Sequence, residues 1–88
     1  MMALTIERDD HEWYIIDATG LKRVADTTSR VRNRAAAICA CLNTGELPEC
    51  WSYVAPAAQG RPGFLFDEDD QIATVWEPRH TAFAAATA

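Results

Sequence analysis

The sequence is organised around residues 28–45, TSRVRNRAAAICACLNTG, the one stretch with the pattern of an amphipathic helix. Apolar side chains recur there at positions i, i+4, i+7 and i+11, which lie within roughly 60° of one another on an α-helix. These side chains belong to Val31, Ala35, Ile38 and Leu42. Thr28 or Ser29 can cap the first turn through a side-chain oxygen, and Gly45 can end the helix in the left-handed conformation. We therefore predict a helix whose core face is this apolar stripe.

The opposite face of the helix, the alanine face, is small and nearly apolar. It carries Asn33, Ala36, Ala37 and Ala40, where a solvated helix usually has long polar side chains. Such a surface allows another backbone to approach closely, either the C-terminal tail or a partner, and a second copy of the chain is one such partner. Alanine is also the strongest helix former, so the same face is consistent with simple solvation. The sequence leaves both interpretations open and predicts a monomer or a homodimer.

Short strands are predicted on both sides of the helix, from runs of β-branched and aromatic residues bounded by turn residues. Leu4 and Ile6 alternate with polar neighbours, and a turn at 9–11 leads into a second strand at 13–16. The other expected strands are at 21–25, 51–54, 64–66 and 72–76, with a loop at 55–63 and a C-terminal tail at 79–88. The order β-β-β-α-β-β-β predicts a single α+β domain (1–88), in which one helix packs on an antiparallel sheet.

Length and composition place the chain among small folded proteins. Its 88 residues suffice for one domain with a thin core, and a hydrophobic content of 49% with 24% charged residues argues against disorder. No stretch resembles a signal peptide or a membrane-spanning segment, and three cysteines are an odd number. We therefore expect a cytoplasmic protein with free thiols and no membrane association.

The formal net charge of −5 conceals two acidic regions. The first acidic turn contains Asp9, Asp10 and Glu12, and the acidic run consists of Asp67, Glu68, Asp69 and Asp70. Adjacent carboxylates repel one another, and those of the acidic run contribute nothing obvious to folding. We therefore expect both regions to face a basic protein partner, with the acidic run steering association.

Five of the eight basic residues lie between these regions. This basic island consists of Lys22, Arg23, Arg30, Arg32 and Arg34. Three of its arginines fall in the first turns of the predicted helix, where the helix dipole disfavours cations, so we expect something to offset their charge. One interpretation is internal neutralisation by the first acidic turn, and the other is a binding site for an anion or a partner.

The sequence offers little for catalysis or metal binding. Cys39 and Cys41 point about 160° apart on a helix and cannot chelate one ion together, and Cys39 is expected to be a small buried residue. His11, Cys50 and His80 lack the spacing of a zinc site, and the acidic run lacks the Gly and Glu positions of an EF-hand. A nucleophile elbow, a Cys–His signature and a Gly-rich phosphate loop are also missing. We expect a protein without enzymatic activity, cofactor or metal.

A compact, acidic, alanine-rich domain of hairpin, helix and hairpin resembles the small inhibitors that phages and mobile elements encode, including anti-CRISPR proteins. The resemblance lies in size, charge and layout. It implies a protein that binds a bacterial defence nuclease or surveillance complex, such as a CRISPR-Cas component, and blocks guide, target DNA or nuclease recruitment. Such inhibitors often place an acidic surface against a basic channel of the partner, and the acidic run and first acidic turn would supply that surface here.

The alternative from another class is a small nucleic-acid-binding or regulatory domain that uses the basic island, residues 22–34. The net negative charge argues against generic nucleic-acid binding, which needs a positive surface. A gel shift with duplex DNA at low salt separates the two hypotheses, because only the second predicts salt-sensitive binding to DNA.

Overall fold

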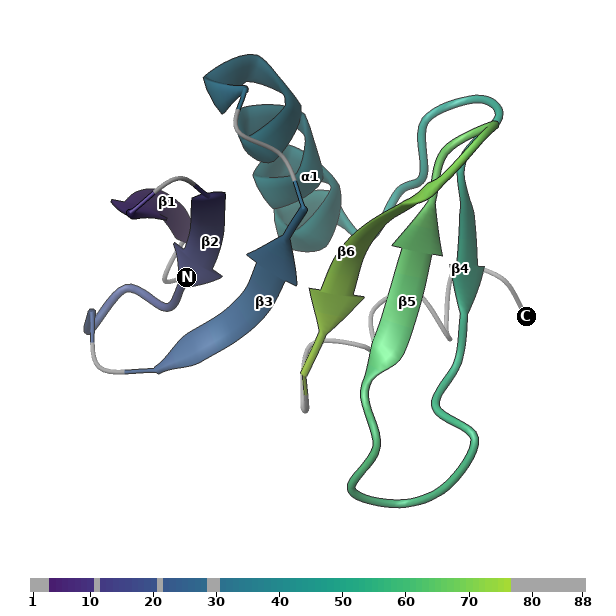
Figure 1. Ribbon diagram of the computed structural model, residues 1–88. Helices are drawn as coiled ribbons and strands as arrows, with labels where there is room; N and C mark the ends of the chain where they lie inside the picture. The colour runs from purple at the N-terminus through teal and green to yellow at the C-terminus, as the bar shows by residue number, and fades with distance from the viewer. Residues whose placement is uncertain (1–3, 11, 21, 29–30, 77–88) are drawn as a thin grey trace.

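The computed structural model describes residues 4–10, 12–20, 22–28 and 31–76 (Figure 1). Within these residues the chain forms one helix and six strands. In chain order they are β1 (Thr5–Asp9), β2 (Glu12–Ile16), β3 (Arg23–Thr27), α1 (Arg32–Thr44), β4 (Ser52–Val54), β5 (Gly63–Phe66) and β6 (Gln71–Val75). The predicted α+β class and the order β-β-β-α-β-β-β are confirmed.

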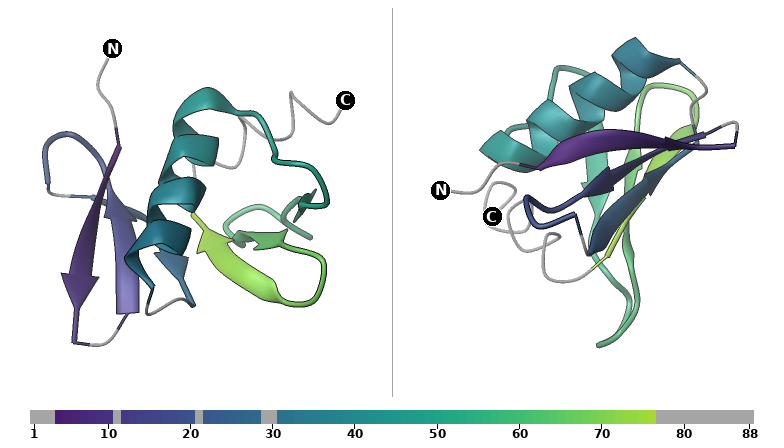
Figure 2. Two further views of the ribbon diagram at one scale, coloured as in Figure 1. Left: turned by 90° about the horizontal axis from the view of Figure 1, so that it is seen from above. Right: turned by 90° about the vertical axis from the view of Figure 1, so that its left-hand side faces the viewer.

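All six strands form one antiparallel sheet in the order β1-β2-β3-β6-β5-β4. Each half of the sheet is built from strands that follow one another in sequence, and the two halves meet where β3 pairs with β6. The helix lies on one face of this sheet, as Figure 2 shows, and packs against β1 and β2. After the helix the chain enters the sheet at its far edge, and β5 and β6 return it to the centre.

The helix begins later than the sequence predicts. Its first residue is Arg32 and its N-cap is Val31, which has no side-chain oxygen to act as a cap. Val31 was expected in the core stripe, but its position ahead of the first turn leaves it 60% exposed. Thr28, an expected cap, instead directs its hydroxyl to the carbonyl oxygens of Gln71 and Ile72 at the start of β6, at 3.3 and 3.4 Å. Thr28 is therefore bonded to the sheet, although the sequence alone predicts that it caps the helix.

The predicted end of the helix is confirmed, and its last turns hold the start of the chain. Gly45 has a φ of 76°, and its N–H donates to the carbonyl of Cys41 at 2.8 Å. The Asn43 amide accepts the backbone N–H of Leu4 at 2.9 Å and donates to the Leu4 carbonyl at 3.3 Å. The thiol of Cys39 also donates to this carbonyl, at 3.3 Å. These bonds fix the entry into β1 against the helix.

The third strand begins and ends two residues later than predicted, at Arg23 and Thr27. Asp26 is a weak strand former, but tertiary contacts override this preference. Asp26 pairs with residues of both β2 and β6, and the hydroxyl of buried Thr27 donates to the carbonyl of Trp13 at 2.6 Å. Strand β3, which joins the two halves of the sheet by pairing with β6, therefore extends to Thr27.

The core lies between the helix and the sheet and draws on both halves of the sheet. Ile38 and Leu42 are fully buried, as predicted, in a cluster with Ile15 of β2 and Leu65 of β5. From the sequence, Ile38 and Leu42 are expected to lie under Trp13 or Ile15 of the first hairpin and under Phe64 or Trp76 of the last. Ile15 does belong to the core cluster. From the last hairpin it is Leu65 that enters the core, because neighbouring strand residues point to opposite faces.

The alanine face is largely open to solvent in the described part of the chain. Asn33, Ala37 and Ala40 are exposed, and Ala36 is half-buried. The expectation that the tail covers this face falls on residues 79–88, outside the described residues. Also outside them are the predicted positions His11, Ser29, Arg30 and His80.

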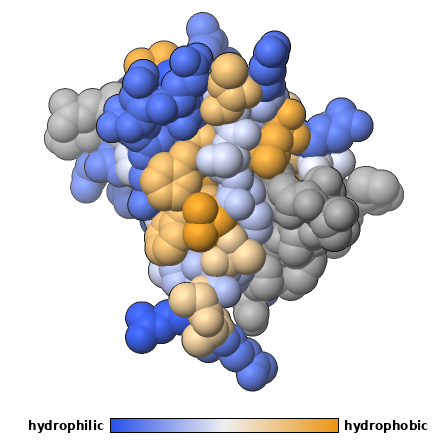
Figure 3. Space-filling view, turned by 90° about the vertical axis from the view of Figure 1, so that its right-hand side faces the viewer, coloured by the Kyte–Doolittle hydropathy of each residue, from blue (hydrophilic) through white to orange (hydrophobic). Residues whose placement is uncertain are grey.

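The free edge of the sheet at β4 is short. Strand β4 has three residues, and Pro56 follows it closely, which suits an edge strand because proline cannot donate a hydrogen bond to a neighbouring strand. Val54 is 50% exposed here, and Figure 3 shows apolar side chains in a band across this side of the molecule, with hydrophilic groups above and below. A short edge next to a proline offers a second chain little backbone to pair with.

Candidate functional site

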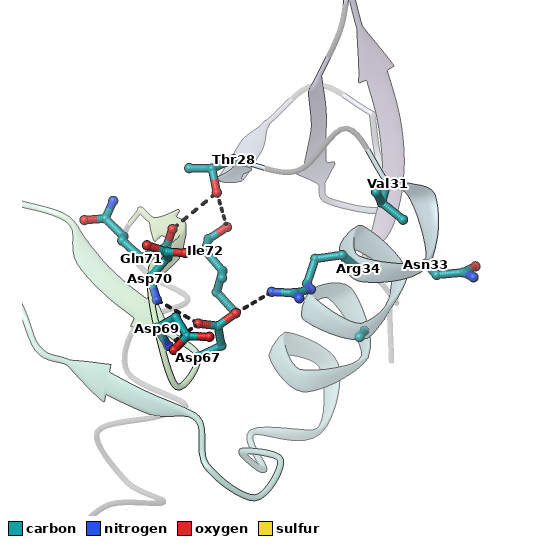
Figure 4. A pocket seen from close by; sticks show the side chains of 10 residues that line it. Thr28, Val31, Asn33, Arg34, Asp67, Asp69, Asp70, Gln71 and Ile72 are labelled. Carbon is teal, nitrogen blue, oxygen red and sulfur yellow. Dashed lines mark hydrogen bonds and ion pairs between the residues drawn. The ribbon is translucent and has the colours of Figure 1, made fainter.

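A cleft of about 630 Å³ lies between the first turns of α1 and the turn that joins β5 to β6. On the helix side its wall is formed by Val31, Asn33, Arg34 and Ala37. On the sheet side the wall is formed by Asp67, Asp69, Asp70, Gln71 and Ile72, with Thr28 beside them (Figure 4). The cleft thus brings together the acidic run and part of the basic island, which the sequence analysis treats as separate surfaces.

The two sides of the cleft are joined by an ion pair. The Nη1 atom of Arg34 lies 2.7 Å from Oδ2 of Asp67, and Figure 4 shows the arginine reaching from the helix toward the turn. The side chain of Asp67 is only 18% exposed, against 42% for Arg34. A shielded pair of this geometry is screened less by salt than two exposed charges would be.

Asp67 also organises its own turn. Its Oδ1 atom accepts the backbone N–H groups of Asp69 and Asp70, each at 2.8 Å, and its backbone N–H donates to the Asp70 carbonyl at 3.0 Å. The hydrogen bonds from Asp70 and Asp69, followed by that from Arg34, lower the pKa of the Asp67 carboxyl to about 2. Asp67 is therefore a structural residue, and the expectation that the acidic run contributes nothing to folding is wrong for this position.

The other three residues of the acidic run, Glu68, Asp69 and Asp70, are exposed. They are carried on a turn whose backbone is fixed by Asp67, so their carboxylates are presented from a defined position. A smaller hollow of about 230 Å³ on this part of the surface is lined by Glu49 together with Glu68 and Asp69. Glu49 is not among the site residues predicted from the sequence. Glu49 is nineteen positions from Glu68 in the chain, and no local pattern links them.

The first acidic turn is partly neutralised by Arg23. The guanidinium of Arg23 lies 3.6 Å from Oδ2 of Asp9, forms an ion pair with Asp26, and stacks over the Tyr14 ring at 4.0 Å from its centre. Asp26 also accepts the indole N–H of Trp76 at 3.1 Å. This network joins three strands, β1, β2 and β3, to the residue that follows β6, and it agrees with internal neutralisation for this arginine.

Asp10 and Glu12 complete the first acidic turn and are exposed. Together with Asp9 and Arg23 they line a shallow hollow of about 340 Å³. Asp10 has a φ of 44°, a left-handed conformation that aspartate tolerates better than most residues. All the described residues that line this hollow are charged, whereas the cleft also has apolar lining residues.

The basic island is divided between these two places. Arg23 belongs to the sheet network and Arg34 to the cleft, while Lys22 and Arg32 are exposed. The offset expected for arginines near the helix N-terminus is confirmed for Arg34, because a carboxylate lies against it. Its partner is the acidic run, however, and not the first acidic turn.

The cysteines lie as free thiols in the described structure. Cys39 is buried, as predicted, and Cys41 is buried as well, whereas Cys50 is exposed. Burial raises the pKa of the Cys41 thiol to about 11, and also raises the pKa of Cys39. Among the described residues no three His, Cys, Asp or Glu side chains are placed to hold a metal ion. The described part of the chain likewise has no helix long and apolar enough to cross a membrane.

Comparison with protein-family models, with curated proteins and with solved structures finds no significant match.

Proposed function

We propose that this protein is a non-enzymatic inhibitor that binds a bacterial defence nuclease or surveillance complex of the CRISPR-Cas type. The observation that carries the proposal is the construction of the β5–β6 turn. Asp67 pins the turn internally, and Glu68, Asp69 and Asp70 are exposed on it. Fixed, exposed carboxylates suit a basic protein surface, because little freedom is lost when they dock.

The placement of the arginines supports an acidic contact surface over a basic one. Arg23 and Arg34 are both engaged by carboxylates of the chain itself, so their charge is offset before any partner arrives. A nucleic-acid-binding domain needs cations directed at phosphates. The arrangement therefore favours the inhibitor over the alternative of a DNA- or RNA-binding domain.

A role in a phage or mobile element is proposed because the chain resembles the inhibitors that these encode in size, charge and layout. Nucleases and surveillance complexes that hold nucleic acid in a channel line it with lysine and arginine. A small acidic domain with a fixed carboxylate cluster can compete for such a channel. This mechanism needs no catalysis by the inhibitor.

The test compares two variants with the same change in charge. The acidic-run variant is Glu68→Gln, Asp69→Asn, Asp70→Asn, and the comparison variant is Asp9→Asn, Asp10→Asn, Glu12→Gln in the first acidic turn, whose charge Arg23 already partly offsets. Asp67 is kept because it holds the turn. Each protein is expressed in bacterial strains that carry one defined CRISPR-Cas type, and protection against a targeted phage is measured.

The parent protein is expected to block interference in at least one strain, and the acidic-run variant is expected to lose most of this effect. With the purified complex, the same variant should associate more slowly and with a weaker dependence on salt. Loss of inhibition in Arg32→Ala together with full activity of the acidic-run variant would place the contact on the basic island instead. Failure of the parent to inhibit any complex would reject the proposed function.

A further inference from the structure

We propose that the cleft between α1 and the acidic run is an anchor site for a partner segment in which an aliphatic side chain adjoins a lysine or arginine. This inference rests on the proposed function, because it specifies the chemistry that the acidic run would meet on a protein partner. It adds an apolar contact to a surface that is otherwise recognised by charge alone.

The apolar part of the site comes from three residues of the cleft wall. Val31, the N-cap ahead of the first turn of α1, is 60% exposed. Ala37 is exposed and has no long side chain to fill the space beside it, and Ile72 lies buried on the sheet side. An aliphatic side chain entering here would cover the exposed surface of Val31 and Ala37, which favours binding.

The charged part of the site selects the neighbour of that side chain. Arg34 pairs with Asp67, and the low pKa of Asp67 keeps this pair ionised at neutral pH. Asp69 and Asp70 add two exposed carboxylates to the same rim, so the described lining of the cleft carries a net negative charge. A cation beside the aliphatic side chain is attracted to this rim, whereas an acidic peptide or a nucleic acid is repelled.

The cleft also has a suitable size. Its volume of about 630 Å³ lies in the range of about 300–1,000 Å³ found for ligand pockets. One large side chain and parts of its neighbours fill such a space. The Arg34–Asp67 pair joins the two walls of the cleft.

Three synthetic peptides test the proposal with ¹⁵N-labelled protein by NMR titration. The probe is acetyl-Gly-Leu-Lys-Arg-Gly-amide, the first control replaces Leu by Ser, and the second replaces Lys-Arg by Glu-Glu. The probe is expected to shift amide signals within residues 31–37 and 67–72. The Ser peptide should bind about 10- to 100-fold more weakly, because it lacks the aliphatic side chain, and the Glu-Glu peptide should cause no shift.

Two leucine substitutions on exposed helix positions provide the matched control in the protein. Ala37→Leu fills the cleft and should weaken binding of the probe at least about tenfold, whereas Ala40→Leu lies outside the lining and should leave it unchanged. Both alanines are exposed, so both variants are expected to keep dispersed NMR spectra. Asp69→Asn with Asp70→Asn should also weaken binding and reduce its salt dependence.

The outcomes separate this inference from the proposed function. Equal affinity for the Leu and Ser peptides, shifts outside the cleft, or no effect of Ala37→Leu would overturn the anchor site and leave docking through the carboxylates intact. Binding of the probe in the cleft by a parent protein that inhibits no defence complex would support the anchor site and reject the proposed function.

Discussion

Asp67 shows how a single residue changes the meaning of a charged stretch. In the sequence it is one of four equivalent carboxylates, but in the structure it alone accepts bonds from two backbone N–H groups and from Arg34. The arginine is thirty-three positions away, so no local pattern predicts this contact. The geometry of the turn decides that Asp67, and not one of its neighbours, makes these bonds. The sequence shows only that the turn is polar.

The state of Asp67 predicts a specific dependence of stability on pH. Its pKa of about 2 in the folded protein is below the ordinary value of about 3.9 for an unfolded chain. The stabilisation is therefore complete above about pH 4 and is lost as the pH falls through about 2. The melting temperature of Asp67→Asn should be lower than that of the parent at pH 7, and the difference should narrow as the pH falls from about 4 to about 2.

Asp69→Asn provides the control for this experiment, because it removes a carboxylate of the same acidic run that does not bind Arg34. It should change the melting temperature at pH 7 much less than Asp67→Asn does. A difference between the parent and Asp67→Asn that stays constant between pH 7 and pH 2 would contradict the role assigned to this carboxylate.

At the scale of elements, the residues of the predicted apolar stripe differ in burial. Leu42 is 1% exposed, whereas Val31 from the same predicted stripe is 60% exposed. Leu42→Ala should lower the free energy of unfolding by about 2–5 kcal/mol, because it leaves a cavity in the core. Val31→Ala should change it by less than about 0.5 kcal/mol. Urea titration measures both values, and similar costs for the two substitutions would contradict the observed start of the helix.

The alanine face of α1 gives a second prediction at this scale. Ala40 is exposed, so Ala40→Glu costs little in an isolated molecule, but a glutamate buried at an interface would lack a partner. If two copies of the chain associate through this face, the variant should dissociate the homodimer without lowering the stability of the monomer. Light scattering with a thermal melt measures both properties. An unchanged oligomeric state and melting temperature would mean that the face is simply solvated.

The elements themselves were largely predictable because their signals are local. Alternating apolar residues, turn residues and the Gly45 cap define six strands and one helix in the correct order. The errors lie where tertiary contacts compete with local preference. Thr28 bonds to β6 instead of capping the helix, and Thr27 is drawn into the sheet by the carbonyl of Trp13.

At the scale of the whole molecule, the sequence does not reveal how the two halves of the sheet are joined. The β3–β6 pairing connects strands that are separated in the chain by α1, β4 and β5. Hydrophobic alternation is compatible with other strand orders as well. The candidate cleft follows from this topology, since β6 at the centre of the sheet brings the acidic run beside the helix. Its charged residues were visible in the sequence, whereas their juxtaposition and its apolar wall were not.

The central position of β3 and β6 predicts that the two halves unfold together. The core cluster includes Ile15 from one half and Leu65 from the other, and both contact the same buried environment as the helix. Beyond the paired strands, the N–H of Thr28 donates to the carbonyl of Ile72 at 3.1 Å, and that of Trp76 donates to the carbonyl of Val24 at 2.8 Å. These two amides lie across the junction and report its opening.

In native-state hydrogen exchange, the amides of Thr28 and Trp76 should therefore exchange with a free energy equal to that of global unfolding measured in urea. The amide of Glu46 bonds to the exposed hydroxyl of Thr44, at 3.2 Å, and should exchange through small local openings. A single urea transition, the same by fluorescence and by circular dichroism, is the corresponding equilibrium result. If Thr28 and Trp76 instead exchange well below the global free energy, the two halves of the sheet separate before the core unfolds.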